Sequence, residues 1–287
     1  MRRRYELTDQ QYERIEPLLS GKPGDPGRNA EDNRRFMNAV YWIARTGAPW
    51  ADLPERFGKY DTVYQRFNRW AKKERWKAIF EALQEPDLDW VMIDSSVVRA
   101  HQHAAGQKSS AEAEVLGRSR GGFSTKINVA RDALGNPLQI VLTPGQTGDC
   151  PQAEPLLRAI LPDSVLKTGA ELPPNEGLPR IGAVLGDKGY DSNDLLAYVA
   201  SLEAEAVIPS KKNRNEQREI DRELYKDRNK IERFIGWIKH YRRVATRYEK
   251  TARNYLAMLH LRLSDGVASV GVKRTFHLSA RPSKSLM

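Results

Sequence analysis

Apolar side chains in the first 85 residues recur at the three- and four-residue spacing of amphipathic helices. This spacing predicts helices over residues 7–19, 31–45, 62–72 and 76–83. Thr8, followed three residues later by Gln11, has the residue types of a helix N-cap, and Pro17 can end the first helix early. The pattern predicts an all-α region that is compatible with a helix-turn-helix-like module.

From Asp89 on, short apolar segments bounded by turn residues replace that pattern. They predict strands over residues 90–94, 123–130, 138–143, 181–185 and 206–208. Helices are predicted over residues 149–161, 193–200, 219–240 and 253–263. Three strands followed by strands and helices in alternation indicate a mixed α+β domain.

The domain organisation follows from this change of period. We expect an all-α domain over residues 1–85 and a mixed α+β domain over residues 89–264. Residues 265–287 are rich in Ser, Arg and Lys and have no clear periodicity, so we expect a disordered tail there.

The predicted helix 219–240 concentrates polar chemistry on one face. Tyr225, Arg228, Glu232 and Lys239 fall within about 60° of one another at 100° per residue. The neighbouring stripe is apolar and consists of Ile231, Phe234, Ile235 and Ile238. One carboxylate is therefore held among cations at the edge of a buried helix.

Two aspartates upstream each end an apolar segment, Asp94 after residues 91–93 and Asp187 after residues 183–186. Alone, either side chain would be more typical of a turn cap or a solvated carboxylate. Together with Glu232, two strand-end aspartates can hold a pair of Mg²⁺ ions against a phosphodiester.

The spacing of Tyr225, Arg228, Glu232 and Lys239 resembles the YREK signature of bacterial insertion-sequence transposases of the DDE type. Residues 93–101 (IDSSVVRAH) and 186–191 (GDKGYD) are similar to segments of the insertion-sequence-five group. Residues 47–54 (GAPWADLP) and 64–70 (YQRFNRW) resemble N-terminal segments of the same group. The resemblance covers roughly residues 5–263.

The resemblance implies an RNase H-like catalytic domain, a mixed five-stranded sheet with flanking helices, in which the first and fourth strands are neighbours. It implies that Asp94 bridges two Mg²⁺ ions while Asp187 and Glu232 each bind one, with Mn²⁺ able to substitute. The activity would be cutting at terminal inverted repeats and joining the 3′ ends to target DNA. Because two ends are processed together, a homodimer or larger synaptic complex is implied. The alternatives are an RNase H-like nuclease or resolvase without strand transfer, and an inactive transposase-derived DNA-binding protein.

The distribution of charge favours a polyanionic partner, double-stranded DNA. Residues 205–287 contain 20 Lys and Arg against 9 Asp and Glu, a net charge of +11, whereas residues 90–204 have a net charge of −3. We expect Arg228 and Lys239 to contact phosphates, and Tyr225 either to pack beside the site or to touch the DNA backbone. Further predicted DNA contacts are Lys126, Lys188, Lys211, Lys212, Gln65, Arg66 and Arg69. For the last three, a helical scaffold or dimerisation domain with solvated arginines is the competing interpretation.

Composition excludes other classes of protein. No run approaches 18 consecutive apolar residues, and the basic N-terminus is not followed by an apolar signal segment. A single cysteine, Cys150, allows neither an internal disulfide nor a cysteine-based zinc site. We expect a cytoplasmic protein with no membrane partner.

Overall fold

The structure, a computed structural model, describes residues 5–25, 29–105, 114–119, 121–161 and 180–270. The α-helices of this part of the chain are α1 (Asp9–Ile15), α2 (Asn33–Thr46), α3 (Tyr60–Lys72), α4 (Arg75–Ala82), α5 (Ala153–Arg158), α7 (Asn193–Ser201), α8 (Arg222–Lys226), α9 (Asn229–Ile238), α10 (Arg242–Ala245) and α11 (Ala252–Val270). The strands are β1 (Trp90–Ala100), β2 (Gly117–Ser119), β3 (Gly122–Arg131), β4 (Pro137–Pro144), β5 (Ala183–Leu185), β6 (Glu205–Val207) and β7 (Thr246–Arg247). Within these residues no helix is both long and apolar enough to cross a membrane.

Each predicted helix and strand has a counterpart in the structure. The prediction that the first strand ends at Asp94 is wrong, because β1 continues to Ala100 along its pairing with β3, so Asp94 lies inside the strand. Thr8 caps α1 as expected, since its side chain accepts from the Gln11 backbone and Gln11 reciprocates. The prediction of one continuous helix over 219–240 is wrong, because Asp227 and Arg228 form a turn between α8 and α9. The prediction of a disordered tail from Asp265 is wrong for residues 265–270, which are the last turns of α11. Residues 271–287 lie outside the described residues.

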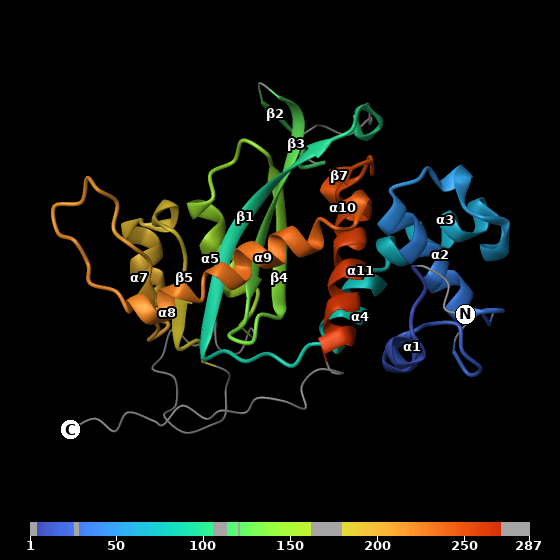
Figure 1. The fold of residues 1–287 in the computed structure, drawn as a ribbon, viewed down its shortest axis with the longest axis horizontal. Coiled ribbons are helices and arrows are strands. Elements are labelled where there is room, and N and C mark those ends of the chain that lie inside the picture. The colour runs from blue at the N-terminus through green and yellow to red at the C-terminus, as the bar shows by residue number, and fades with distance from the viewer. Residues whose placement is uncertain (1–4, 26–28, 106–113, 120, 162–179, 271–287) are drawn as a thin grey trace.

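The sheet has the mixed topology that the RNase H-like prediction requires. Within the described residues the sheet has seven strands, two more than predicted. Five of them follow the order β4–β3–β1–β5–β6, and the short strands β2 and β7 lie beside β3 and β1. Strand β1 is antiparallel to β3 and parallel to β5, and β5 is parallel to β6. Strands β1 and β5 correspond to the first and fourth predicted strands and are neighbours in the sheet (Figure 1). The α+β fold class is confirmed.

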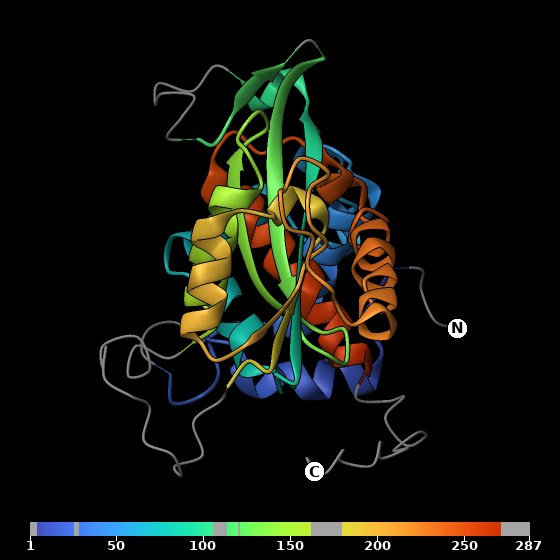
Figure 2. The same cartoon turned by 90° about the vertical axis from the view of Figure 1, so that its left-hand side faces the viewer.

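Both faces of the sheet are covered, which explains the unbroken apolar run before Asp94. Met92 and Val98 of β1 point into a core that includes α9 and α11. Val91 and Ile93 point to the opposite face and pack with α5 and α7. Figure 2, viewed from the side, shows the sheet between these helical layers.

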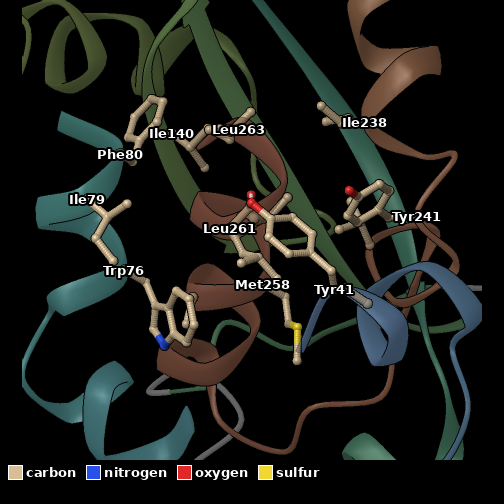
Figure 3. Close-up of a cluster of buried hydrophobic side chains, with 14 of the residues drawn as sticks. Tyr41, Trp76, Ile79, Phe80, Ile140, Ile238, Tyr241, Met258, Leu261 and Leu263 are labelled. Carbon is tan, nitrogen blue, oxygen red and sulfur yellow. Dashed lines mark hydrogen bonds between the residues drawn. The ribbon is translucent and has the colours of Figure 1, made fainter. Parts of the chain in front are cut away.

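Helix α11 lies between the sheet and the N-terminal helices (Figure 1). Met258, Leu261 and Leu263 of this helix are buried in the same cluster as Trp76 and Phe80 of α4 (Figure 3). Tyr41 of α2 and Ile140 of β4 belong to this cluster as well. The apolar core is consequently continuous across the boundary expected near residues 85–89.

Candidate active site

The register of β1 and β5 brings the two aspartates to the same level of the sheet. Met92 pairs with Leu185, and Asp94 and Asp187 each lie two residues beyond that pair on neighbouring parallel strands. Parallel strands that run in register carry their next residues to the same edge. The sheet therefore places Asp94 and Asp187 together, as the sequence predicted.

Asp94 is partly buried, with 16% of its side chain exposed. Its Oδ1 accepts the Ser95 backbone N–H at 2.8 Å. Burial, with the nearby charges of Asp187 and Glu232, raises the pKa of the Asp94 carboxyl, against the lowering effect of the Ser95 N–H and Arg228. The charges of all three carboxylates are thus concentrated in one region.

The turn after β5 fixes Asp187. Its Oδ1 accepts the Gly189 backbone N–H at 2.7 Å and caps a 3₁₀ turn over Lys188–Tyr190. A Cβ atom at position 189 would lie 2.8 Å from that same oxygen, so any other residue there would displace the Asp187 carboxylate. Lys188 is exposed beside it.

Arg228 joins the helix to the strand. Its guanidinium lies 3.0 Å from Glu232 Oε1 and 3.7 Å from Asp94 Oδ2. Glu232 is in the first turn of α9, and 58% of its side chain is exposed. Arg228 therefore forms an i, i+4 ion pair with Glu232, and the same guanidinium also lies next to Asp94.

Lys239 and Tyr225 differ in how they relate to the site. Lys239 Nζ donates to Ser96 Oγ at 2.6 Å and to the Val97 carbonyl at 3.3 Å, close to Asp94 along β1. Partial burial lowers the pKa of Lys239. Tyr225 is on α8, before the turn, and packs half-buried against the apolar core. The four signature residues therefore do not share one helix face, because the turn between α8 and α9 separates Tyr225 from the other three.

Some of the other predicted DNA contacts are exposed, and others bind groups within the protein. Gln65, Arg69 and Lys212 are exposed, and Lys211 is half-buried. Lys126 is only 8% exposed, and its ammonium donates to the Asp149 carboxylate. The prediction of Lys126 as an outward-facing phosphate contact does not match this placement.

Arg66 does not lie on an exposed recognition surface as predicted. Its guanidinium stacks over Phe36 at 4.1 Å and over Trp70 at 4.8 Å, and it donates to the side chain of Asn33. Burial, with the charge of Arg69, lowers the pKa of Arg66 to about 10. Arg66 holds α2 and α3 together.

Sequence reasoning missed a buried aspartate four residues after Asp187. The Asp191 side chain is fully buried and accepts from Arg214 at 2.9 Å, from Arg218 at 2.8 Å and from the Lys211 backbone. Burial alone would raise its pKa, but these hydrogen bonds hold the pKa well below its usual range. Asp191 thereby anchors the basic segment between β6 and α8 beside the turn that carries Asp187, a long-range pairing with no local sequence signal.

Comparisons with known proteins place the chain in a family. Residues 85–264 match the family "Transposase DDE domain", and residues 7–80 match "Putative transposase of IS4/5 family". The chain therefore belongs to the DDE transposases of insertion sequences.

Individual relatives agree with that assignment. The chain is 40% identical over 140 residues to "Putative transposase for insertion sequence element IS6501" of Brucella ovis, covering 48% of this chain and 94% of the relative. It is 45% identical over 105 residues to "Uncharacterized protein y4sN" of Sinorhizobium fredii, covering 36% of this chain and 82% of the relative. It is 32% identical over 137 residues to "Putative transposase for insertion sequence element IS402" of Burkholderia cepacia, covering 48% of this chain and 59% of the relative.

Proposed function

We propose that the chain cuts DNA at the terminal inverted repeats of its insertion sequence and joins the 3′ ends to target DNA. The observation that carries this proposal is the meeting of three carboxylates from separate elements. Asp94 and Asp187 lie at one level of neighbouring strands, and Arg228 links Asp94 to Glu232 of α9. We assign Asp94, Asp187 and Glu232 as the catalytic residues.

The three side chains fit divalent metal in donor type, because Mg²⁺ prefers carboxylate oxygens. Burial and mutual charge also raise the pKa of Asp94, so a cation at this place would be stabilised. In the described part of the chain, however, no three Asp, Glu, His or Cys side chains are close enough to hold an ion as they stand. Arg228 occupies the position between Asp94 and Glu232 and supplies the compensating positive charge.

We therefore propose that Asp94, Asp187 and Glu232 hold two Mg²⁺ ions once Arg228 releases them, with Mn²⁺ as a substitute. When bound, such ions activate the attacking water or 3′-hydroxyl and neutralise the leaving oxygen. The Arg228 guanidinium can transfer to a DNA phosphate, since its planar fork suits phosphate and carboxylate equally. Lys239, held at Ser96, places a second cation at the same strand.

The DNA surface that we propose comprises lysines next to this centre and polar side chains on α3. Lys188 follows Asp187 directly, and Lys211 and Lys212 lie in the segment anchored by Asp191. On α3, Gln65 and Arg69 are exposed and can reach base edges or phosphates. Two ends would be held together by a homodimer or a larger synaptic complex.

A reaction of the purified chain with Mg²⁺, labelled element ends and target DNA, resolved on a denaturing gel, tests this proposal. We expect cleaved ends and, in addition, longer products in which a 3′ end is joined to target. Cleavage without joined products would indicate a nuclease or resolvase. Binding without cleavage would indicate an inactive DNA-binding descendant, and either result would overturn the proposal.

A further inference from the structure

A polar cluster lies on the side of β1 opposite to α9, at the level of Asp94. Side chains alternate between the two faces of a strand, so Ser95 points away from the Glu232 side. Its neighbour Ile93 packs with α5 and α7, which identifies that face. Lys126 of β3 pairs with Val97 and is the diagonal neighbour of Ser95.

Asp149 is the centre of this cluster. One carboxylate oxygen, Oδ1, accepts from Ser95 Oγ at 2.8 Å and from Lys126 Nζ at 2.5 Å. Lys126 also donates to the Thr147 carbonyl at 2.5 Å, so its buried ammonium is held between two groups of the loop after β4. Asp149 thus ties this loop to both β1 and β3.

The cluster is joined to the proposed catalytic centre through Ser95, the residue that follows Asp94 in the chain. Ser95 donates its side chain to Asp149 and its backbone N–H to Asp94 Oδ1. The orientation of the Asp94 carboxylate therefore depends on a peptide that Asp149 holds from the other face. Side chains that orient a metal ligand without contacting the metal affect metal affinity and activity. Asp149 can act on Asp94 in this way through Ser95.

Tyr190 extends the cluster towards Asp187. The residue is 2% exposed, belongs to the turn that Asp187 caps, and its hydroxyl lies beside Ser95. Within the described residues this hydroxyl has no hydrogen-bond partner of ordinary geometry. Asp94, Asp149 and Asp187 are the charged groups that surround it. This cluster therefore adjoins both Asp94 and Asp187.

We propose that Asp149 is a positioning residue that fixes Asp94 through Ser95, with Lys126 as its buried counter-ion. This inference rests on the proposed function of Asp94. It also gives Lys126 a role within the protein in place of the DNA contact expected from sequence. Asn at position 149 would keep the shape but remove the charge that Lys126 requires.

The test is a double-mutant cycle of Asp149→Asn and Ser95→Ala in the full-length chain. We expect Asp149→Asn to lower the single-turnover cleavage rate at saturating DNA by about 10- to 100-fold. The affinity for end DNA should stay unchanged. The Mg²⁺ affinity measured by calorimetry without DNA should fall alongside the rate, and in the Ser95→Ala background Asp149→Asn should add little to either loss.

Glu154→Gln is the matched control, because it removes a carboxylate from a surface ion pair with Arg158 on nearby α5. It should leave rate and metal affinity unchanged. A lowered melting temperature with wild-type rate and metal affinity for Asp149→Asn would make Asp149 merely structural. Weaker DNA binding at an unchanged rate would make it a DNA contact, and additive losses in the cycle would exclude action through Ser95.

Failure of the inference is separable from failure of the proposed function. If the wild-type chain cleaves ends and Asp149→Asn cleaves equally well, only the positioning role is overturned. If the wild-type chain does not cleave, the proposed function fails. The calorimetric cycle then still decides whether Asp149 supports a metal ligand.

Discussion

At the residue scale, Asp94 is a buried acid whose charge the folded protein tolerates at a cost. Its pKa is raised by burial, so the folded chain binds the proton at higher pH than the unfolded chain, for which the value is 3.8. Stability from this group is thus greatest at low pH and is lost as pH rises through the folded pKa. At neutral pH the ionised carboxylate destabilises the metal-free protein.

Asp94→Asn should therefore stabilise the metal-free protein at pH 7, because it removes the ionised form that burial disfavours. The gain should shrink towards about pH 3, below the unfolded value of 3.8, because the wild-type carboxyl is then mostly protonated in both states. Urea unfolding in the presence of a chelator, at both pH values, measures this difference. Glu223→Gln, at an exposed position of α8, should show no such gain. A loss of stability at pH 7 would mean that the attraction of Arg228 outweighs burial.

The three candidate carboxylates could be named from the sequence, but the residues that surround them could not. Asp94, Asp187 and Glu232 could be found because each has a local signal, the end of an apolar segment or a helix face. The partners of Asp149 and Asp191 lie 20 to 54 positions away in the chain, and no spacing rule encodes such pairs. Lys126 was misassigned for the same reason, since a buried lysine and an exposed one look alike in sequence.

At the element scale, α3 carries two arginines three positions apart with different surroundings. Arg69 is exposed, whereas Arg66 lies over the rings of Phe36 and Trp70. Arg69→Ala should lower the slope of log affinity for end DNA against log salt by about one unit and leave the melting temperature unchanged. Arg66→Ala should leave the slope unchanged and destabilise by about 1–2 kcal/mol. A salt series beside thermal melts separates the two, and a reduced slope for Arg66→Ala would place it at the DNA.

The packing of α4 against α11 includes a buried histidine. His260 stacks on Phe80 with ring centroids 5.6 Å apart, and burial, with the charge of Lys77, lowers its pKa to about 3. The unfolded chain binds this proton near pH 6.5, so stability is full above that pH and falls as pH drops towards 3.

His260→Phe keeps an aromatic ring but cannot titrate. Between pH 6.5 and 4 the wild-type free energy of unfolding should fall relative to that of the variant by up to about 1.4 kcal/mol per pH unit. Urea titrations at several pH values measure the two slopes. Parallel pH profiles would show that His260 is protonated in the folded protein or is not a determinant of acid stability.

At the scale of the whole molecule, the N-terminal helices and the sheet share one core. Asp265 of α11 accepts from Gln11 of α1, from Arg45 of α2, and from Tyr241 and Arg262. The sequence suggested a disordered tail here because the composition is polar and the partners are distant. The element order and the β1–β5 neighbourhood could be predicted, whereas this connection could not.

Deleting residues 1–85 should therefore not leave an independently folded catalytic part. It would expose the surface of α11 that packs on Trp76 and Phe80 and would remove two donors to the buried Asp265. We expect the truncated chain to aggregate or to lose its cooperative thermal transition by circular dichroism. A monomeric truncation that melts cooperatively near the wild-type temperature would establish residues 89–264 as a separate folding unit.

The central proposal is that Asp94, Asp187 and Glu232 act as one centre for phosphodiester chemistry. Its most direct test is single-turnover cleavage of end DNA by Asp94→Asn, Asp187→Asn and Glu232→Gln beside the control Glu223→Gln. Each of the first three should reduce cleavage to background while retaining DNA binding and a cooperative melt, because each removes a metal-binding charge at nearly constant volume. The control should cleave like the wild type. Near-normal cleavage by any one of the three variants would contradict the assignment at that position.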